Sequence, residues 1–316
     1  MAHESSAVCC GVALTVDAAV RLLDPARLSE LQGLELKARL IVEGYLAGVH
    51  RSPYHGFSVE FAEHREYVPG DDLRYVDWKV FGKTDRIYLK QFDEETNFSC
   101  TVLCDASESM SYQSSSATVP KLEYARWLAA AFAFLVIRQH DAVGLATFDS
   151  ALRDFLRPSS TAGQLRDICR VLDAAPATGE SAIGPILQDF AERMKRRGVV
   201  VMVSDFFDDF ASLERGLRHL SFRRHDAILL QVLDPAEVLF PFEEPTVFHG
   251  LEGWADVQTD PRGVRRAYQQ ELQQHLARLR GLSRELKFDY ALLTTDQPPV
   301  PPLAALLSNR KERRGA

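Results

Sequence analysis

Oxygen-bearing side chains that suit a divalent metal ion follow two apolar, β-prone runs of the sequence. One run ends at Asp105, which opens an Asp-x-Ser-x-Ser loop, and another ends at Ser204-Asp205. Mg²⁺ takes oxygen ligands, keeps several waters and commonly has one or two protein carboxylates. The two aspartates would supply charge, directly or through water, and serine hydroxyls would supply neutral ligands. The predicted ligands of one Mg²⁺ or Mn²⁺ ion are Asp105, Ser107, Ser109, Ser181 and Asp205.

The elements that must position these residues read as buried strands alternating with amphipathic helices. Apolar runs at 99–104, 198–204, 227–233 and 289–295 predict central strands. The strands expected at 141–148 and 151–156 are separated by Asp149-Ser150, which indicates an antiparallel hairpin. The fold class is therefore α/β, a doubly wound and mostly parallel sheet with one antiparallel edge strand.

Strand ends decide between two interpretations of the serines. Taken alone, an Asp-x-Ser-x-Ser pattern is explained by side chains that cap helices. In open parallel sheets, however, ligands bind beyond the carboxyl ends of the strands. Ser181 lies in a further loop, before a predicted helix, so three oxygen-rich loops are expected to converge on one edge. This convergence favours the metal site.

The chain before the sheet predicts a second part. Apolar residues from Leu28 to Ile41 recur at helical spacing, after a start signal at Asp24-Pro25. The segment from 51 to 97 is dense in charged and aromatic residues and predicts short strands and loops. We expect an N-terminal helix and a charged, aromatic brace over 1–97, and an α/β domain over 98–316.

The brace is predicted from charges that crowd together in the sequence. Paired charges are how buried polar segments are tolerated, so they would fasten this segment to the sheet edge. The alternative is a partner-docking surface or a second polar site. The charged residues are Glu63, Arg65, Glu66, Arg74, Asp77 and Lys79.

Two resemblances follow from these motifs. The Asp-x-Ser-x-Ser-Met loop, the later hydroxyl loop and Ser204-Asp205 resemble the metal-ion-dependent adhesion site of von Willebrand factor A domains, over roughly 99–295. The stretch from Phe61 to Lys79, continued by Phe81 to Asp85 and Gln91 to Thr96, resembles the bacterial domain-of-unknown-function 58 family. One departure is Ser181, where the adhesion site usually has threonine, and the lost methyl packing predicts weaker binding.

The resemblance implies a function in recognition. Family members pair the N-terminal block with an A-type domain and are often associated with MoxR-type AAA+ ATPases. The resemblance implies a non-catalytic recognition or assembly module for a protein partner such as a MoxR-type AAA+ ATPase. The partner would offer an Asp or Glu to the metal. A small shift of the ion could then couple binding to conformation.

Two other classes stay open. A magnesium-dependent phosphatase or phosphotransferase would use Asp105 as nucleophile. The dehalogenase-type pattern needs a carboxylate at position 107, which is Ser107 here, and nothing orients Glu108 or Glu180 as the acid. A metal-free structural scaffold is the third class. No nucleophile–base pair supports cysteine catalysis at Cys104.

Composition argues against some classes of partner and location. The net charge of −7 argues against nucleic acid, which needs a basic face. A frayed helix end explains the basic residues from Arg310 to Arg314. No run reaches the roughly 18 apolar residues of a membrane span. Five cysteines without zinc-type spacing are expected to be free, buried thiols, and a cytoplasmic location follows by default.

Overall fold

A computed structural model describes residues 23–49, 64–66, 88–90, 99–194 and 196–315. Contacts divide the chain into two compact units, Ser52–Phe98 and the combination of Met1–Arg51 with Ser99–Ala316. In the smaller unit, strands β1 (His64–Glu66) and β2 (Tyr88–Lys90) pair antiparallel. They fit the short strands expected there. Of the predicted brace residues only Arg65 and Glu66 are described, both in β1, and Glu63, Arg74, Asp77 and Lys79 lie outside the described residues.

A six-stranded sheet in the order β10-β7-β6-β3-β4-β5 forms the centre of the larger unit. All neighbours are parallel except β4 and β5, which form the antiparallel edge pair. The predicted sheet is therefore confirmed. Its strands are β3 (Ser99–Asp105), β4 (Ala142–Phe148), β5 (Leu152–Ser159), β6 (Val199–Ser204), β7 (Asp226–Leu233) and β10 (Asp289–Thr294).

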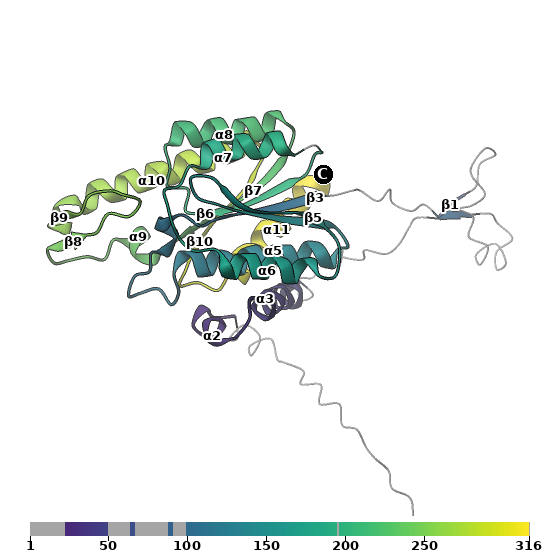
Figure 1. The fold of residues 1–316 in the computed structure, drawn as a ribbon, viewed down its shortest axis with the longest axis horizontal. Helices are drawn as coiled ribbons and strands as arrows, with labels where there is room; N and C mark the ends of the chain where they lie inside the picture. Colours follow the sequence, from purple (N-terminus) through teal and green to yellow (C-terminus); the bar gives the residue numbers. More distant parts are fainter. Residues whose placement is uncertain (1–22, 50–63, 67–87, 91–98, 195, 316) are drawn as a thin grey trace, which may run out of the picture. The chain divides into compact units, whose positions relative to one another are not determined.

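Helices cover both faces of this sheet, as Figure 1 shows. Every residue of β6 is buried, because helices cover the strand on both faces. Such a strand is mostly apolar, and all residues of β6 except Ser204 are apolar. One face packs against α7 (Ile183–Arg193), α8 (Phe210–Phe222) and the C-terminal half of α10 (Pro261–Glu285). The other packs against α5 (Lys121–Arg138), α6 (Gln164–Ala174) and α11 (Val300–Gly315).

Two N-terminal helices, α2 (Pro25–Glu30) and α3 (Leu34–Val49), replace the single helix expected up to Gly44. The link between the two helices contains Gly33, whose φ of +87° is left-handed and suits glycine. Helix α3 packs on α5, where Lys37 Nζ lies 3.0 Å from Glu123 Oε1. The contacts thus group these helices with the sheet, whereas the expected boundary at 97/98 placed them with the charged segment.

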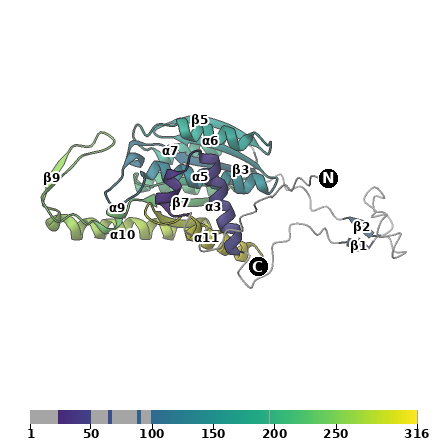
Figure 2. The same cartoon turned by 90° about the horizontal axis from the view of Figure 1, so that it is seen from below.

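An insertion separates β7 from α10. It begins with the short helix α9 (Pro235–Leu239), whose N-terminus has a capping box formed by Asp234 and Glu237. Strands β8 (Thr246–Phe248) and β9 (Val257–Thr259) then pair antiparallel as a hairpin. The hairpin stands beside the N-terminal end of α10 (Figure 2). A cluster of aromatic rings in mutual contact holds it there: Phe240, Phe242, Phe248 and Tyr268.

Candidate metal site

The predicted ligands come from three loops at one edge of the sheet. Strands β3 and β6 are parallel neighbours, so Asp105 and Ser204-Asp205 end side by side. The loop between α6 and α7 joins them through two backbone hydrogen bonds, from Glu108 to the Gly179 carbonyl and from Thr178 to the Ala106 carbonyl, each 2.9 Å. The expected convergence of the loops is present in the structure.

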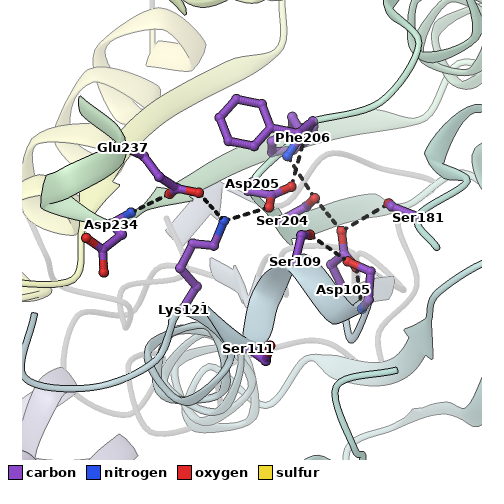
Figure 3. A network of polar contacts seen from close by, with 12 residues as sticks. Asp105, Ser109, Ser111, Lys121, Ser181, Ser204, Asp205, Phe206, Asp234 and Glu237 are labelled. Atoms are coloured by element: carbon purple, nitrogen blue, oxygen red, sulfur yellow. Dashed lines mark hydrogen bonds and ion pairs between the residues drawn. The ribbon is translucent and has the colours of Figure 1, made fainter. Parts of the chain in front are cut away.

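Asp105 lies at the centre of this edge and is fully buried. Its Oδ2 accepts hydrogen bonds from Ser204 Oγ at 2.5 Å and from Ser181 Oγ at 3.4 Å (Figure 3). Its Oδ1 accepts from the Ser107 backbone N–H at 2.9 Å. Hydroxyls from the second loop and from the end of β6 therefore both point at one carboxylate.

The serine hydroxyls do not act as helix caps. Ser107 precedes the 3₁₀ turn η2 (Glu108–Ser111) and makes no capping hydrogen bond through its side chain. Its Oγ instead lies 3.1 Å from Ser109 Oγ. Helix α7 starts after Ala182, so Ser181 is not in its capping position. The capping interpretation is wrong for these serines.

Asp205 is in a different state, because a buried lysine already neutralises it. Lys121 Nζ lies 2.8 Å from Asp205 Oδ2 and 2.7 Å from Glu237 Oε1, between the two carboxylates in Figure 3. Burial alone would lower the pKa of Lys121, but the charges of Asp205 and Glu237 raise it above the usual value. The remaining oxygen of Asp205, Oδ1, accepts from the Phe207 backbone N–H at 3.1 Å.

Lys121 and Glu237 were missed in the sequence. A lysine at the first position of a helix stands against the helix dipole, which disfavours cations at that end. This placement was an available signal for a carboxylate partner. Nothing in the sequence identified which carboxylates those would be, because Glu237 lies 116 residues away.

Within the part of the chain that the structure describes, Asp105 differs from Asp205 in having no cation beside it. Among the salt bridges of the described residues, none reaches Asp105. Burial, followed by the charge of Asp205, raises the pKa of Asp105 to about 7, against the hydrogen bonds from Ser204 and Ser107. A buried carboxylate without a counterion is costly, so this position favours a bound cation.

The donor chemistry at this edge fits a hard divalent ion. Within the described residues no three His, Cys, Asp or Glu side chains group to hold a metal, so any ligand set must use hydroxyls. Asp105 with Ser107, Ser109 and Ser181 offers one carboxylate and three hydroxyl oxygens, which suits Mg²⁺ or Mn²⁺. Asp205 is already paired with the Lys121 ammonium, which favours its contact through water.

A fourth segment also reaches the site. Glu252, in the loop of the β8–β9 hairpin, accepts hydrogen bonds from the backbone N–H groups of Ser109 and Ser181, each at 3.3 Å. Its own N–H donates to Glu108 Oε2 at 2.7 Å. No sequence signal pointed to Glu252, because its contacts join residues between 71 and 144 positions apart.

Neither catalysis by a nucleophilic Asp105 nor cysteine catalysis finds a suitable partner group among the described residues. A nucleophilic Asp105 would need an acid beside it, yet Glu108 is engaged by the Glu252 backbone and Glu180 is exposed. Burial raises the pKa of the Cys104 thiol to about 12, which keeps it unreactive. Among the described residues Cys100, Cys104 and Cys169 are free and buried, as expected.

The sheet defines a doubly wound α/β protein, and the oxygen-rich loops at its carboxyl edge lie where ligands bind in such sheets. The chain belongs to the family described as "Protein of unknown function DUF58", whose family model matches residues 63–278. The uncharacterized proteins Rv1480 of Mycobacterium tuberculosis and Mb1516 of Mycobacterium bovis are each 29% identical over 223 residues. These matches cover 69% of this chain and 68% of each relative.

Solved structures with a similar fold include von Willebrand factor A domains. BatB from Bacteroides thetaiotaomicron is 14% identical, with a TM-score of 0.46 over 68% of this chain and 99% of its own. The SpRpn10 VWA domain is 11% identical, with a TM-score of 0.37 over 67% of this chain and 94% of its own. Among the described helices, none has both the length and the apolar character needed to cross a bilayer.

Proposed function

We propose that this chain is a non-catalytic recognition or assembly module that binds a protein partner through one divalent ion. The ion, Mg²⁺ or Mn²⁺, would be held by Asp105 with Ser107, Ser109 and Ser181. Asp205 would contribute from behind, through water. When bound, the ion supplies a positive centre that attracts an acidic side chain.

One observation supports this proposal above the others. Asp105 is a fully buried carboxylate with two hydroxyls donating to it and no salt bridge from any described residue. Asp205, equally buried, already has Lys121 as its cation. In a metal-free scaffold we would expect a basic side chain of the protein to pair with each of the two buried carboxylates. Lys121 pairs with Asp205, whereas no described basic residue pairs with Asp105.

The surrounding residues prepare the site without taking part in chemistry. The Ser204 hydroxyl and the Ser107 N–H fix the orientation of the Asp105 carboxylate. Lys121 fixes Asp205 and at the same time holds Glu237 of α9, so the site is joined to the hairpin insertion. Movement of Asp205 toward a bound ion would strain this connection, which gives a route from ion binding to the insertion.

Calorimetric titration of Mg²⁺ and Mn²⁺ into EDTA-treated protein tests the proposal. We expect saturable binding by the wild type and its loss in Asp105→Asn, which keeps the side-chain volume. Asp189→Asn is the matched control, because Asp189 is exposed on α7 and pairs with Arg193. Absence of binding by the folded wild-type protein would refute the metal site and leave the metal-free scaffold.

A MoxR-type AAA+ ATPase is the partner that we propose from the family resemblance. Such an ATPase itself needs Mg²⁺, so removing the metal would disturb both proteins. Binding should therefore be compared at constant Mg²⁺ between the wild type and Asp105→Asn. Equal affinities would contradict a metal-bridged contact with this partner.

A further inference from the structure

The hairpin loop between β8 and β9 returns to the candidate metal site and places a carboxylate on it. Glu252 accepts one hydrogen bond on each carboxylate oxygen, from Ser109 N–H on Oε1 and from Ser181 N–H on Oε2. Ser109 belongs to the loop after β3 and Ser181 to the loop before α7. One side chain from the insertion therefore bridges the two loops that carry the proposed ligands.

A tight turn at the tip of the hairpin loop presents Glu252 to the site. Glu252 (φ +56°) and Gly253 (φ +79°) are its central residues, and the Trp254 N–H closes it on the Leu251 carbonyl at 3.1 Å. Positive φ at both central residues is what a type I′ turn requires. The hydrogen bond from the Glu252 N–H to Glu108 Oε2, at 2.7 Å, attaches this turn to the loop after β3.

Electrostatics give the contact a meaning beyond packing. Glu252 brings a carboxylate against the backbone of the two loops that carry the proposed ligands, and no salt bridge between described residues involves it. A carboxylate without a counterion is stabilised by a cation beside it. The arrangement therefore suits a carboxylate that approaches a positive ion, which is also what an acidic partner would offer.

We infer that Glu252 is an internal acidic ligand of this site, an inference that rests on the proposed metal binding. Its carboxylate takes the position that an Asp or Glu of a partner would take. A partner must displace Glu252 to reach the ion, so the hairpin competes with acidic partners. Displacement would also free the hairpin loop, including Trp254, whose side chain is already 78% exposed.

Removal of the carboxylate, followed by its chemical replacement, tests this role. Glu252→Gly is the informative variant, because glycine accepts the positive φ and leaves space beside the two N–H groups. We expect its Mn²⁺ affinity, measured by calorimetry on the full chain, to fall about 10-fold. Acetate should restore the affinity in this variant and leave the wild type unchanged, since Glu252 fills the position there.

Two further variants separate a ligand from a structural contact. Glu252→Gln keeps the side-chain size and loses the charge, so its Mn²⁺ affinity should fall without rescue by acetate. Glu243→Gly changes an exposed glutamate of the same insertion and should bind Mn²⁺ like the wild type.

Each remaining result overturns the inference. Wild-type affinity in Glu252→Gly, or a weakened affinity that acetate does not restore, would refute Glu252 as a ligand while Asp105→Asn still shows the metal site to be real. Absence of Mn²⁺ binding by the wild type would refute the metal site itself, and the inference with it.

Discussion

Replacement of Lys121 by methionine removes the cation that lies between Asp205 and Glu237 at the site edge. Methionine keeps an unbranched side chain of similar length, but it also loses the contacts of the ammonium with the rings of Tyr112 and Phe207, whose centroids lie 6.0 and 5.5 Å from Nζ. The variant leaves Asp205, which is fully buried, without its ion-pair partner. Its effect on the free energy of unfolding therefore measures how much the buried ion pair matters.

The expected loss is large. Breaking a buried ion pair by removing one partner typically costs about 3–5 kcal/mol, because the other charge stays buried and unpaired. Asp205 has an exposed fraction of 0% and so pays this penalty in full, whereas Glu237, at 17%, regains some water. Repulsion from Asp105 acts in the same direction. We expect Lys121→Met to lose about 3–5 kcal/mol.

Urea unfolding followed by circular dichroism measures this loss, with EDTA present to remove metal effects. The double variant Lys121→Met with Asp205→Asn should recover much of the stability, because no unpaired charge is left at Asp205. Asp205→Asn alone should be milder, since Lys121 keeps Glu237. A loss below about 1 kcal/mol in Lys121→Met, or no recovery in the double variant, would refute the reasoning.

Three other outcomes can be checked independently. Burial raises the pKa of Glu123, but hydrogen bonds from Lys37 and Trp127 lower it below the usual value. The contribution of Glu123 to the free energy of unfolding is therefore complete above the unfolded-state pKa, about 4.3. This contribution is lost as the pH falls through the lowered pKa of the native state. Glu123→Gln should cost about 1–2 kcal/mol at pH 7, and denaturant titrations should show the difference from the wild type narrowing below pH 4; a constant difference would contradict this. Gly184→Ala should destabilise by about 1–3 kcal/mol in thermal unfolding, because its Cβ would lie 2.4 Å from the Ser212 carbonyl oxygen where α7 meets α8; an unchanged midpoint would show that the helices can separate freely. Ser181→Ala should weaken Mn²⁺ binding in calorimetry without changing the fold, and unchanged affinity would remove Ser181 from the ligand set.

The sequence predicted the sheet because its strands are buried on both faces. A run such as Val199 to Ser204 can hardly be anything else when an aspartate and helices follow it. The convergence of Asp105, Ser181 and Asp205 was also predicted, since the carboxyl ends of parallel strands share one edge of the sheet. The helix break was less visible: α2 ends at Glu30 and α3 begins after Gly33, although the apolar spacing continues across this link.

The missing parts of the site depend on long-range contacts. Lys121 and Glu252 act through partners that a linear pattern does not pair, and each comes from an element whose placement is decided by packing. Asp205 was predicted as a ligand beside Asp105, and the residue type alone could not show that a lysine already neutralises it. Local patterns indicate where oxygen atoms gather, but the distribution of charge requires the tertiary structure.

The order of the strands has a consequence for how the chain folds during synthesis. Strands β3, β4 and β5 are neighbours in both sequence and sheet, so they can pair early. The other edge of β3 must wait for β6, about a hundred residues later, and non-local parallel pairing is slow. Until then the nascent chain exposes an apolar strand edge, which is a template for aggregation. Cells that make this protein would therefore need to shield that edge until β6 emerges.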